Sequence, residues 1–210
     1  MNIPTKITMA RIVLIVAMLI GLFVCSLIPD FHAPVLGNSG INLVYLIALI
    51  VFVIAASTDY LDGHLARKWN QVTNLGKFLD PIADKLLVNS MLIFLIFPFS
   101  FATGQVIFMP VFCVIVMIVR DLVVDAIRQI AATTGSVIAA NIFGKIKTVL
   151  QMIAIPAVLL NDWPFNYFDS SWPVAVRPSM LLVYLATLAS LLSGVIYLVQ
   201  NFHVLKEKKQ

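Results

Sequence analysis

Apolar runs long enough to cross a lipid bilayer recur along this sequence. Hydrophobic residues make up 61% and charged residues 11% of its 210 residues, and the mean hydropathy is +1.00. A spanning helix needs roughly 20 mainly apolar residues, and a soluble domain would need far more charge to cover its core. The sequence therefore predicts an all-α membrane protein. The six expected transmembrane helices are residues 8–28, 41–62, 79–97, 107–130, 142–161 and 179–202.

The basic residues indicate the orientation of these spans. If the N-terminus is cytoplasmic, thirteen of the fourteen Lys and Arg lie on or near the inner side, and Arg177 alone lies outside. Inner loops are enriched in Lys and Arg, so we expect a multi-pass protein of the cell membrane with both termini in the cytoplasm. Residues 2–11 mix apolar and basic side chains and are expected to form a short helix in the inner interface. No internal repeat is evident, so residues 1–210 are expected to form one domain.

Four aspartates stand out against this apolar background. Asp59 and Asp62 are three residues apart at the inner end of the second span, and Asp80 and Asp84 are four apart at the start of the third. Residues at these spacings share one helix face, and the short connection at 69–74 predicts antiparallel neighbours whose acidic faces meet. Converging carboxylates repel unless cations join them, and hard divalent ions such as Mg²⁺ prefer oxygen ligands. The sequence therefore predicts a metal site at the cytoplasmic face.

Small and basic residues accompany the aspartates. Gly63, Ala66 and Gly76 would let a ligand approach the backbone closely, and Arg67 adds a positive charge at the rim. A purely structural role for the four acids is disfavoured, because each unpaired charge in the membrane costs at least about 2.5 kcal/mol. Carboxylates, small residues and an arginine at a membrane surface favour a site for a phosphorylated substrate.

These residues follow one continuous pattern, D-x2-D-G-x2-A-R-x8-G-x3-D-x3-D, which has eight fixed positions. The pattern resembles the signature of the CDP-alcohol phosphatidyltransferase family, and the six expected spans resemble that family's fold. The opening residues 2–11, NIPTKITMAR, are similar to the N-IP-N-x-LT-x-x-R start of bacterial phosphatidylglycerophosphate synthases, a branch of the family. Thr5 stands where that pattern usually has Asn, and Ile7 where it has Leu.

The resemblance implies a chemistry and a role for each motif residue. Members transfer a phosphatidyl group from CDP-diacylglycerol to an alcohol and release CMP. The residues implied to hold two divalent cations, Mg²⁺ or Mn²⁺, are Asp59, Asp62 and Asp80, with Asp84 beside the ions. Asp84 is also the implied general base. The residues implied to bind the CDP-lipid are Gly63, Ala66, Arg67 and Gly76. The resemblance further implies a homodimer among membrane lipids, and no nucleic-acid partner is expected.

A basic cluster on the fourth and fifth spans bears on the acceptor. Arg120 should face the bundle because its charge is costly in lipid, Arg128 lies near the same helix face, and Lys145 starts the fifth span. Such a cluster suits a phosphate. Together with the N-terminal resemblance it predicts glycerol 3-phosphate as the acceptor. An inositol phosphate, or a second phospholipid as in a cardiolipin synthase, also fits.

Two other interpretations concern charged residues outside the motif. Asp121 or Asp125 could pair with a basic neighbour, and Lys147 and Arg128 could simply follow the positive-inside rule. Arg120 and Asp121 are adjacent and are expected to diverge on the helix surface. A divalent-cation transporter is a rival of a different class. It is disfavoured because a path across the bilayer needs polar residues in the outer halves of the spans, and these are nearly all apolar.

Overall fold

The computed structural model describes residues 2–69, 73–133, 142–169 and 171–202. Within these ranges one long helix overlaps each expected span. The long helices are α1 (Ile3–Leu27), α2 (Leu43–Lys68), α3 (Asn74–Phe94), α4 (Val111–Thr133), α5 (Ile142–Leu159) and α7 (Pro178–Asn201). The shorter elements are strands β1 (Val35–Leu36) and β2 (Ile41–Asn42), the 3₁₀ turns Gly37–Ser39 and Val174–Val176, and helix α6 (Asn166–Asp169). The all-α expectation is confirmed, apart from this two-stranded hairpin.

Four of the described helices are long and apolar enough to cross a membrane: α1, α2 over Leu43–Leu65, α5 and α7. Helices α3 and α4 carry more charge, including Asp80 and Asp84 on α3 and Arg120 on α4. The bundle keeps large apolar side chains on its outside, with Phe112 75% and Phe23 62% exposed. A helix that is apolar on its exposed face as well as its buried face is typical of a membrane span. The chain is therefore a membrane protein.

Helix α1 differs from the expectation at its start. It runs unbroken from Ile3 to Leu27, so residues 2–11 form its first turns rather than a separate interfacial helix. Pro4 lies in the first turn, where a backbone N–H would have no partner within the helix, so proline is tolerated there. No residue from Thr5 to Leu27 ends the helix. The first turns are buried on one side through Thr5, Thr8 and Arg11. This burial places polar residues of α1 inside the bundle.

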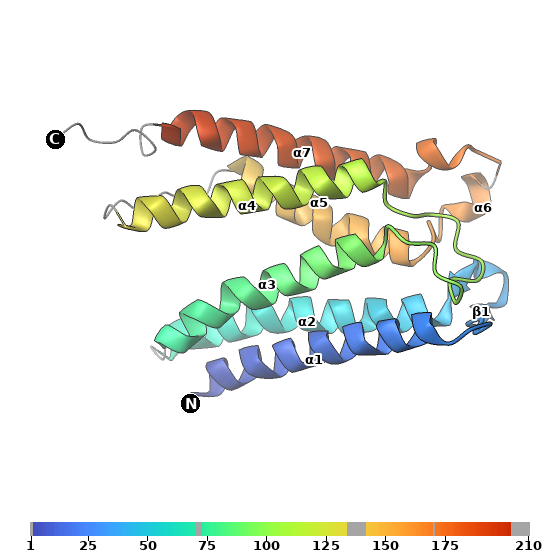
Figure 1. The fold of residues 1–210 in the computed structure, drawn as a ribbon, viewed down its shortest axis with the longest axis horizontal. Helices are drawn as coiled ribbons and strands as arrows, with labels where there is room; N and C mark the ends of the chain where they lie inside the picture. Colours follow the sequence, from blue (N-terminus) through green and yellow to red (C-terminus); the bar gives the residue numbers. More distant parts are fainter. Residues whose placement is uncertain (1, 70–72, 134–141, 170, 203–210) are drawn as a thin grey trace.

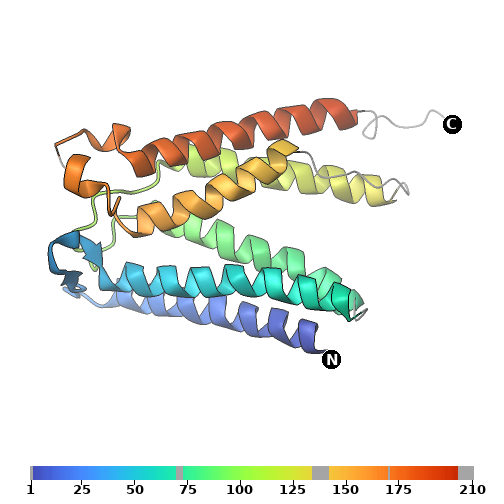
Figure 2. The same cartoon turned by 180° about the vertical axis from the view of Figure 1, so that it is seen from behind.

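The helices form two groups of three (Figure 1). Helices α1, α2 and α3 lie together, and α4, α5 and α7 lie together, with α5 and α4 both packed on α7. The reverse view shows the same division, with α5 facing α2 (Figure 2). The start of α1, the end of α2 and the start of α3 lie at the same end of the bundle as the end of α7. Residues from both groups can therefore meet at this end.

Within the first group, α1 contacts both α2 and α3 more extensively than those two contact each other. The short connection between α2 and α3 includes residues 70–72, which lie outside the described part. Helix α3 begins earlier than expected because the Thr73 hydroxyl accepts a hydrogen bond from the Gly76 N–H at 3.0 Å and caps it. Helix α4 begins later, directly after Pro110. One aspartate of each pair, Asp62 on α2 and Asp80 on α3, contacts Thr8 of α1.

The opposite end of the bundle is closed by side-chain amides. Asn161 donates from Nδ2 to the carbonyls of Gly40 and Gly104 at 3.1 and 2.8 Å, and its Oδ1 accepts from the N–H of Val106 at 2.8 Å. Asn42 likewise donates to the carbonyl of Phe101 at 2.7 Å. Backbone groups that would otherwise be buried without partners are thus satisfied, and these loops are fixed to one another.

Candidate active site

One arginine of α1 connects the two aspartates of α2. Arg11 is 2% exposed, and its two terminal nitrogens, Nη1 and Nη2, donate to Asp59 Oδ1 and Asp62 Oδ2 respectively. Asp62 is also 2% exposed, whereas about half of the Asp59 side chain, 49%, is exposed. A buried carboxylate needs a cation or several hydrogen bonds. In this structure the guanidinium of Arg11 provides the positive charge.

Thr8 connects α2 to α3. Its hydroxyl lies 2.9 Å from Asp62 Oδ2, 3.1 Å from Asp80 Oδ1 and 3.2 Å from the carbonyl oxygen of Pro4. A hydroxyl has one proton to donate, and three oxygen acceptors surround it here. The proton cannot satisfy both carboxylates, so this group of oxygens is short of positive charge.

The four motif aspartates are not gathered into one set of metal ligands. Among the described residues, no group of three or more His, Cys, Asp or Glu side chains is arranged to hold a metal ion. Arg11 bridges Asp59 and Asp62, and Asp84 lines a separate cavity. The physical reason is repulsion, because carboxylates held close together need a cation, and Arg11 provides one for Asp59 and Asp62.

The donor set nevertheless fits a hard divalent ion. Asp59, Asp62 and Asp80 approach one another through Arg11 and Thr8, and all of the groups offered are oxygens, the ligands that Mg²⁺ and Mn²⁺ accept. The surroundings of Thr8 also favour a cation, because three acceptor oxygens there compete for one hydroxyl proton. An ion bound here would take over the charge compensation that Arg11 now provides.

The residues expected to bind the CDP-lipid lie beside the aspartates in the chain. Gly63, Ala66 and Arg67 belong to α2, but the side chains of Ala66 and Arg67 are outside the described part of the structure. Gly76 lies in the first turn of α3, where an added Cβ would be 3.1 Å from Thr73 Oγ1 and 3.6 Å from Thr5 Oγ1. The small size of Gly76 therefore lets α1 and α3 approach each other.

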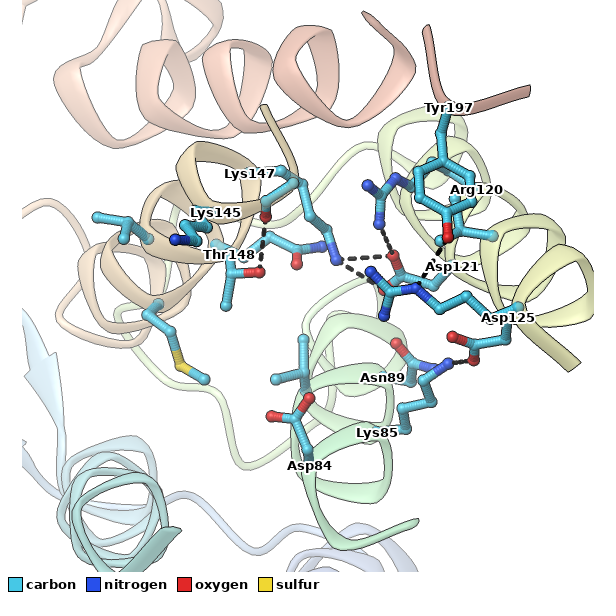
Figure 3. A pocket seen from close by; sticks show the side chains of 17 residues that line it. Asp84, Lys85, Asn89, Arg120, Asp121, Asp125, Lys145, Lys147, Thr148 and Tyr197 are labelled. Atoms are coloured by element: carbon cyan, nitrogen blue, oxygen red, sulfur yellow. Dashed lines mark hydrogen bonds and ion pairs between the residues drawn. The ribbon is translucent and has the colours of Figure 1, made fainter. Parts of the chain in front are cut away.

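A cavity of about 470 Å³ lies between the two groups of helices, close to the aspartates. The three residues expected to bind the acceptor phosphate, Arg120, Arg128 and Lys145, all line it. Asp84 and Lys85 line the cavity from α3 (Figure 3). Arg120 and Asp121 of α4 and Lys147 of α5 line it from the other side. Among the described residues, five cationic and three anionic side chains line the cavity: Lys85, Arg120, Arg128, Lys145, Lys147, Asp84, Asp121 and Asp125. The cavity thus favours an anionic ligand.

Ion pairs account for part of this charge. Lys147 Nζ contacts Asp121 Oδ1 and Oδ2 at 2.8 and 2.7 Å, and Arg120 Nη1 contacts Asp121 Oδ1 at 3.0 Å. Lys85 pairs with Asp125. The expectation that Arg120 and Asp121 diverge was wrong, because the long arginine side chain bends back to its neighbour's carboxylate. Asp121 and Asp125 thus pair with basic neighbours, as the alternative interpretation had it.

The other two basic residues of the cavity, Arg128 and Lys145, form no ion pair with any described residue. Arg128 Nε donates to Tyr197 Oη at 3.1 Å, and its guanidinium carbon lies 5.5 Å from the centre of the Tyr197 ring, a cation–π arrangement. Lys145 is exposed. Two positive charges at the cavity wall are thus available to a ligand.

Several residues at this site were not singled out from the sequence. Thr8 and Arg11 are fixed positions of the N-terminal pattern, NIPTKITMAR, so that resemblance already contained a signal for them. Gln151 lines the cavity, is 2% exposed, and its Nε2 has no hydrogen-bond partner among the described residues. A lone glutamine in an apolar helix belongs to no motif, so the sequence alone does not indicate a role for Gln151.

Comparison with known proteins bears on the same residues. The sequence model of the CDP-alcohol phosphatidyltransferase family matches residues 1–199. A Bacillus subtilis (strain 168) protein named CDP-diacylglycerol–glycerol-3-phosphate 3-phosphatidyltransferase is 43% identical over 206 residues, which cover 98% of this chain and 97% of the relative. Proteins of the same name from Mycoplasma pneumoniae and Haemophilus influenzae are 35% and 33% identical, covering 99% and 94% of this chain and 90% and 91% of the relatives.

The match extends over both the aspartate motif and the helices that carry the basic cavity. It includes Thr8 and Arg11 at one end and Tyr197 near the other. The resemblance that the aspartate spacing suggested is confirmed, and this chain belongs to the CDP-alcohol phosphatidyltransferase family.

Proposed function

We propose that this protein transfers the phosphatidyl group of CDP-diacylglycerol to glycerol 3-phosphate, giving phosphatidylglycerophosphate and CMP, within a single catalytic domain. The observation that carries the proposal is the position of Asp84. It lines the cationic cavity together with Arg120, Arg128 and Lys145, and it lies one helical turn from Asp80, which shares the Thr8 hydroxyl with Asp62. The names of the relatives support glycerol 3-phosphate as the acceptor.

The donor lipid would bind at the aspartate end of α2 and α3. This family generally depends on divalent cations, and Asp59, Asp62 and Asp80 are the residues that would hold two of them, Mg²⁺ or Mn²⁺, with Asp84 alongside. Bound cations would neutralise the diphosphate of the CDP-lipid and stabilise the departing CMP. Gly63, Ala66, Arg67 and Gly76 would admit and hold the cytidine diphosphate, with Arg67 supplying charge.

The acceptor would bind in the adjoining cavity. Its phosphate would lie against Arg120, Arg128 and Lys145, which leaves its terminal hydroxyl to face Asp84. That hydroxyl oxygen forms a bond to the phosphorus of the phosphatidyl group, while the bond from this phosphorus to the CMP oxygen breaks and CMP leaves with the electron pair. Asp84 takes the hydroxyl proton. A carboxylate is a weak base for an alcohol, so the proton moves late, in concert with attack.

The membrane placement is part of the proposal. We infer that α3 and α4 also cross the bilayer, since they are aligned with the four apolar helices in the bundle (Figure 1), which gives six spans. The basic residues support an orientation with the site and both termini at the cytoplasmic face of the cell membrane. A homodimer follows from the resemblance to the family, and light scattering of the purified protein would test it.

One assay tests the function directly. Purified protein is given CDP-diacylglycerol and Mg²⁺, each candidate acceptor is added singly, and CMP release and the lipid product are measured. Release with glycerol 3-phosphate, and much less with an inositol phosphate, phosphatidylglycerol, serine or choline, is the expected result. Release with a different acceptor alone would contradict the assignment of the acceptor. No release with any of them, with Mg²⁺ flux into protein-containing vesicles, would instead support the transporter.

A further inference from the structure

Arg120 is held by one group from its own helix and one from α7. Its Nη1 donates to Asp121 on its own helix, and its Nη2 donates to the hydroxyl of Ser193 on α7. The Arg120 side chain is 12% exposed, and its Nε is buried with no partner among the described residues. A guanidinium can bind a phosphate through two parallel N–H groups only if it is turned correctly. Whatever sets the direction of Arg120 therefore affects how it can meet a ligand.

The next residue of α7, Gly194, lies against the stem of Arg120. A Cβ added at Gly194 would lie 2.8 Å from Arg120 Cγ, 3.6 Å from its Cβ and 4.0 Å from its Cδ. Non-bonded carbon atoms pack at about 3.5–4.0 Å, so the first of these distances is a clash. The atom that clashes is near the backbone of α4, not at the mobile end of the side chain. Any residue other than glycine at position 194 must displace Arg120 or α4.

Two other glycines provide a graded comparison. A Cβ at Gly144, on α5, would lie 3.4 Å from Arg120 Nη2, which is an ordinary contact. A Cβ at Gly21, on α1, would meet no described atom within 4 Å. The requirement for glycine is therefore severe at position 194, slight at 144 and negligible at 21.

We propose that Ser193 and Gly194 are positioning residues for Arg120, and that they set the affinity of the enzyme for the phosphate of its acceptor. Gly194 leaves room for the stem, and Ser193 holds one terminal nitrogen. Arg120 is thereby directed at the cavity with its remaining N–H groups open to the ligand. This inference rests on the proposed function, because it takes Arg120 as a ligand of the acceptor phosphate.

The test measures the kinetics of Gly194→Ala in the full-length enzyme, in detergent micelles containing CDP-diacylglycerol. Misplacing a group that positions the substrate can lower the reaction rate by up to about 100-fold. We therefore expect kcat/KM for glycerol 3-phosphate to fall about 10- to 100-fold, mainly through a higher KM. The KM for CDP-diacylglycerol should stay unchanged. Gly144→Ala should have a small effect and Gly21→Ala none. Ser193→Ala, which leaves the packing intact, should raise the same KM by a smaller factor.

A double variant separates positioning from simple packing. Once Arg120→Ala has removed the stem, Gly194→Ala should add no further loss of kcat/KM, and it should lower the melting temperature less than it does alone. Equal losses in both backgrounds, or equal losses for both substrates, would overturn the inference. If Gly194→Ala does not fold, Ser193→Ala and the double variant still decide it. Failure of the wild type to use glycerol 3-phosphate would refute the proposed function instead, which the Gly194 series cannot do.

Discussion

Asp80 and Asp84 lie one turn apart on α3 but face different surroundings: Asp80 accepts a hydrogen bond from Thr8 of α1, whereas Asp84 lines the cationic cavity between the helix groups. One helix thus presents a carboxylate to each half of the site. This division suits a reaction in which one substrate is held through cations and the other must lose a proton. The predictions below test the two halves separately.

Asp84→Asn should remove turnover while leaving the donor lipid bound. An amide cannot accept the hydroxyl proton, and loss of a general base typically lowers kcat by about 100- to 10,000-fold. CMP release gives the rate, and Mg²⁺-dependent binding of labelled CDP-diacylglycerol gives the affinity. Asp125→Asn is the matched control, because Asp125 lines the same cavity but pairs with Lys85. Activity comparable to wild type in Asp84→Asn would contradict the base assignment.

Thr8→Val should weaken the dependence on metal rather than the binding of the acceptor. The change keeps the shape of the side chain but removes the hydroxyl that Asp62 and Asp80 share. Groups that orient metal ligands typically contribute about 10- to 100-fold in affinity, and the Mg²⁺ concentration for half-maximal activity should rise accordingly. Thr8→Ser should be close to wild type. Thr187→Val, which removes a hydroxyl that donates to the Val183 carbonyl within α7, should have no effect on the Mg²⁺ titration.

Arg11→Ala should make folding stability depend on divalent ions. Removing Arg11 leaves the buried Asp62 without its cation, a loss of about 3 kcal/mol when one partner of a buried pair is deleted. In EDTA the variant should melt at a lower temperature than wild type, and Mg²⁺ should raise its melting temperature by more than it raises that of wild type. An identical Mg²⁺ shift in the two proteins would argue against an ion binding at these carboxylates.

Lys145 and Lys147 should differ in what they support. Lys145 forms no described ion pair, so Lys145→Ala should raise the KM for glycerol 3-phosphate at least about tenfold, the value of one hydrogen bond to a charged group, with little change in melting temperature. Lys147 is bound to both oxygens of Asp121, so Lys147→Met should lower stability, by about 1–3 kcal/mol. If the two variants behave alike in both measurements, the distinction between ligand and scaffold is wrong.

Gln151→Leu should raise the stability of the protein and lower its activity. The Nε2 of Gln151 is buried without a partner among the described residues, and such a group costs about 1–3 kcal/mol. Leucine removes the cost, so the melting temperature should rise, while kcat/KM for the acceptor falls if the amide is kept for the ligand. Gln200→Leu, at an exposed position near the end of α7, should change neither quantity. A stabilised variant with full activity would remove Gln151 from the site.

The helices, and the helix face that each pair of aspartates shares, could be predicted from the sequence because both depend on local patterns. Six apolar runs specify six helices, and Asp59 with Asp62 must share a face at a spacing of three. The basic residues of α4 and α5 that the sequence grouped together also line one cavity, as expected if charges on mainly apolar helices turn toward the interior of the bundle.

The contacts of α1 could not be predicted from the sequence, because they join positions far apart in the chain. Thr8 and Asp80 are separated by 72 residues, and Arg11 and Asp59 by 48. The sequence predicted that the two acidic faces meet directly, whereas Thr8 of α1 contacts both Asp62 and Asp80, and Arg11 of α1 joins the two aspartates of α2. The close packing of Gly194 on Arg120 was hidden in the same way, since it depends on the spacing of α4 and α7.

The contribution of α1 also bears on how the protein is made. Arg11 is translated 48 residues before Asp59, so the first helix enters the membrane with a charge whose partner does not yet exist. Only when α2 has followed does the guanidinium gain its carboxylates, and only after α3 does Thr8 reach Asp80. The site is therefore complete only when α1, α2 and α3 are all in place, and an affinity tag fused just ahead of α1 would adjoin the helix whose first turns complete it.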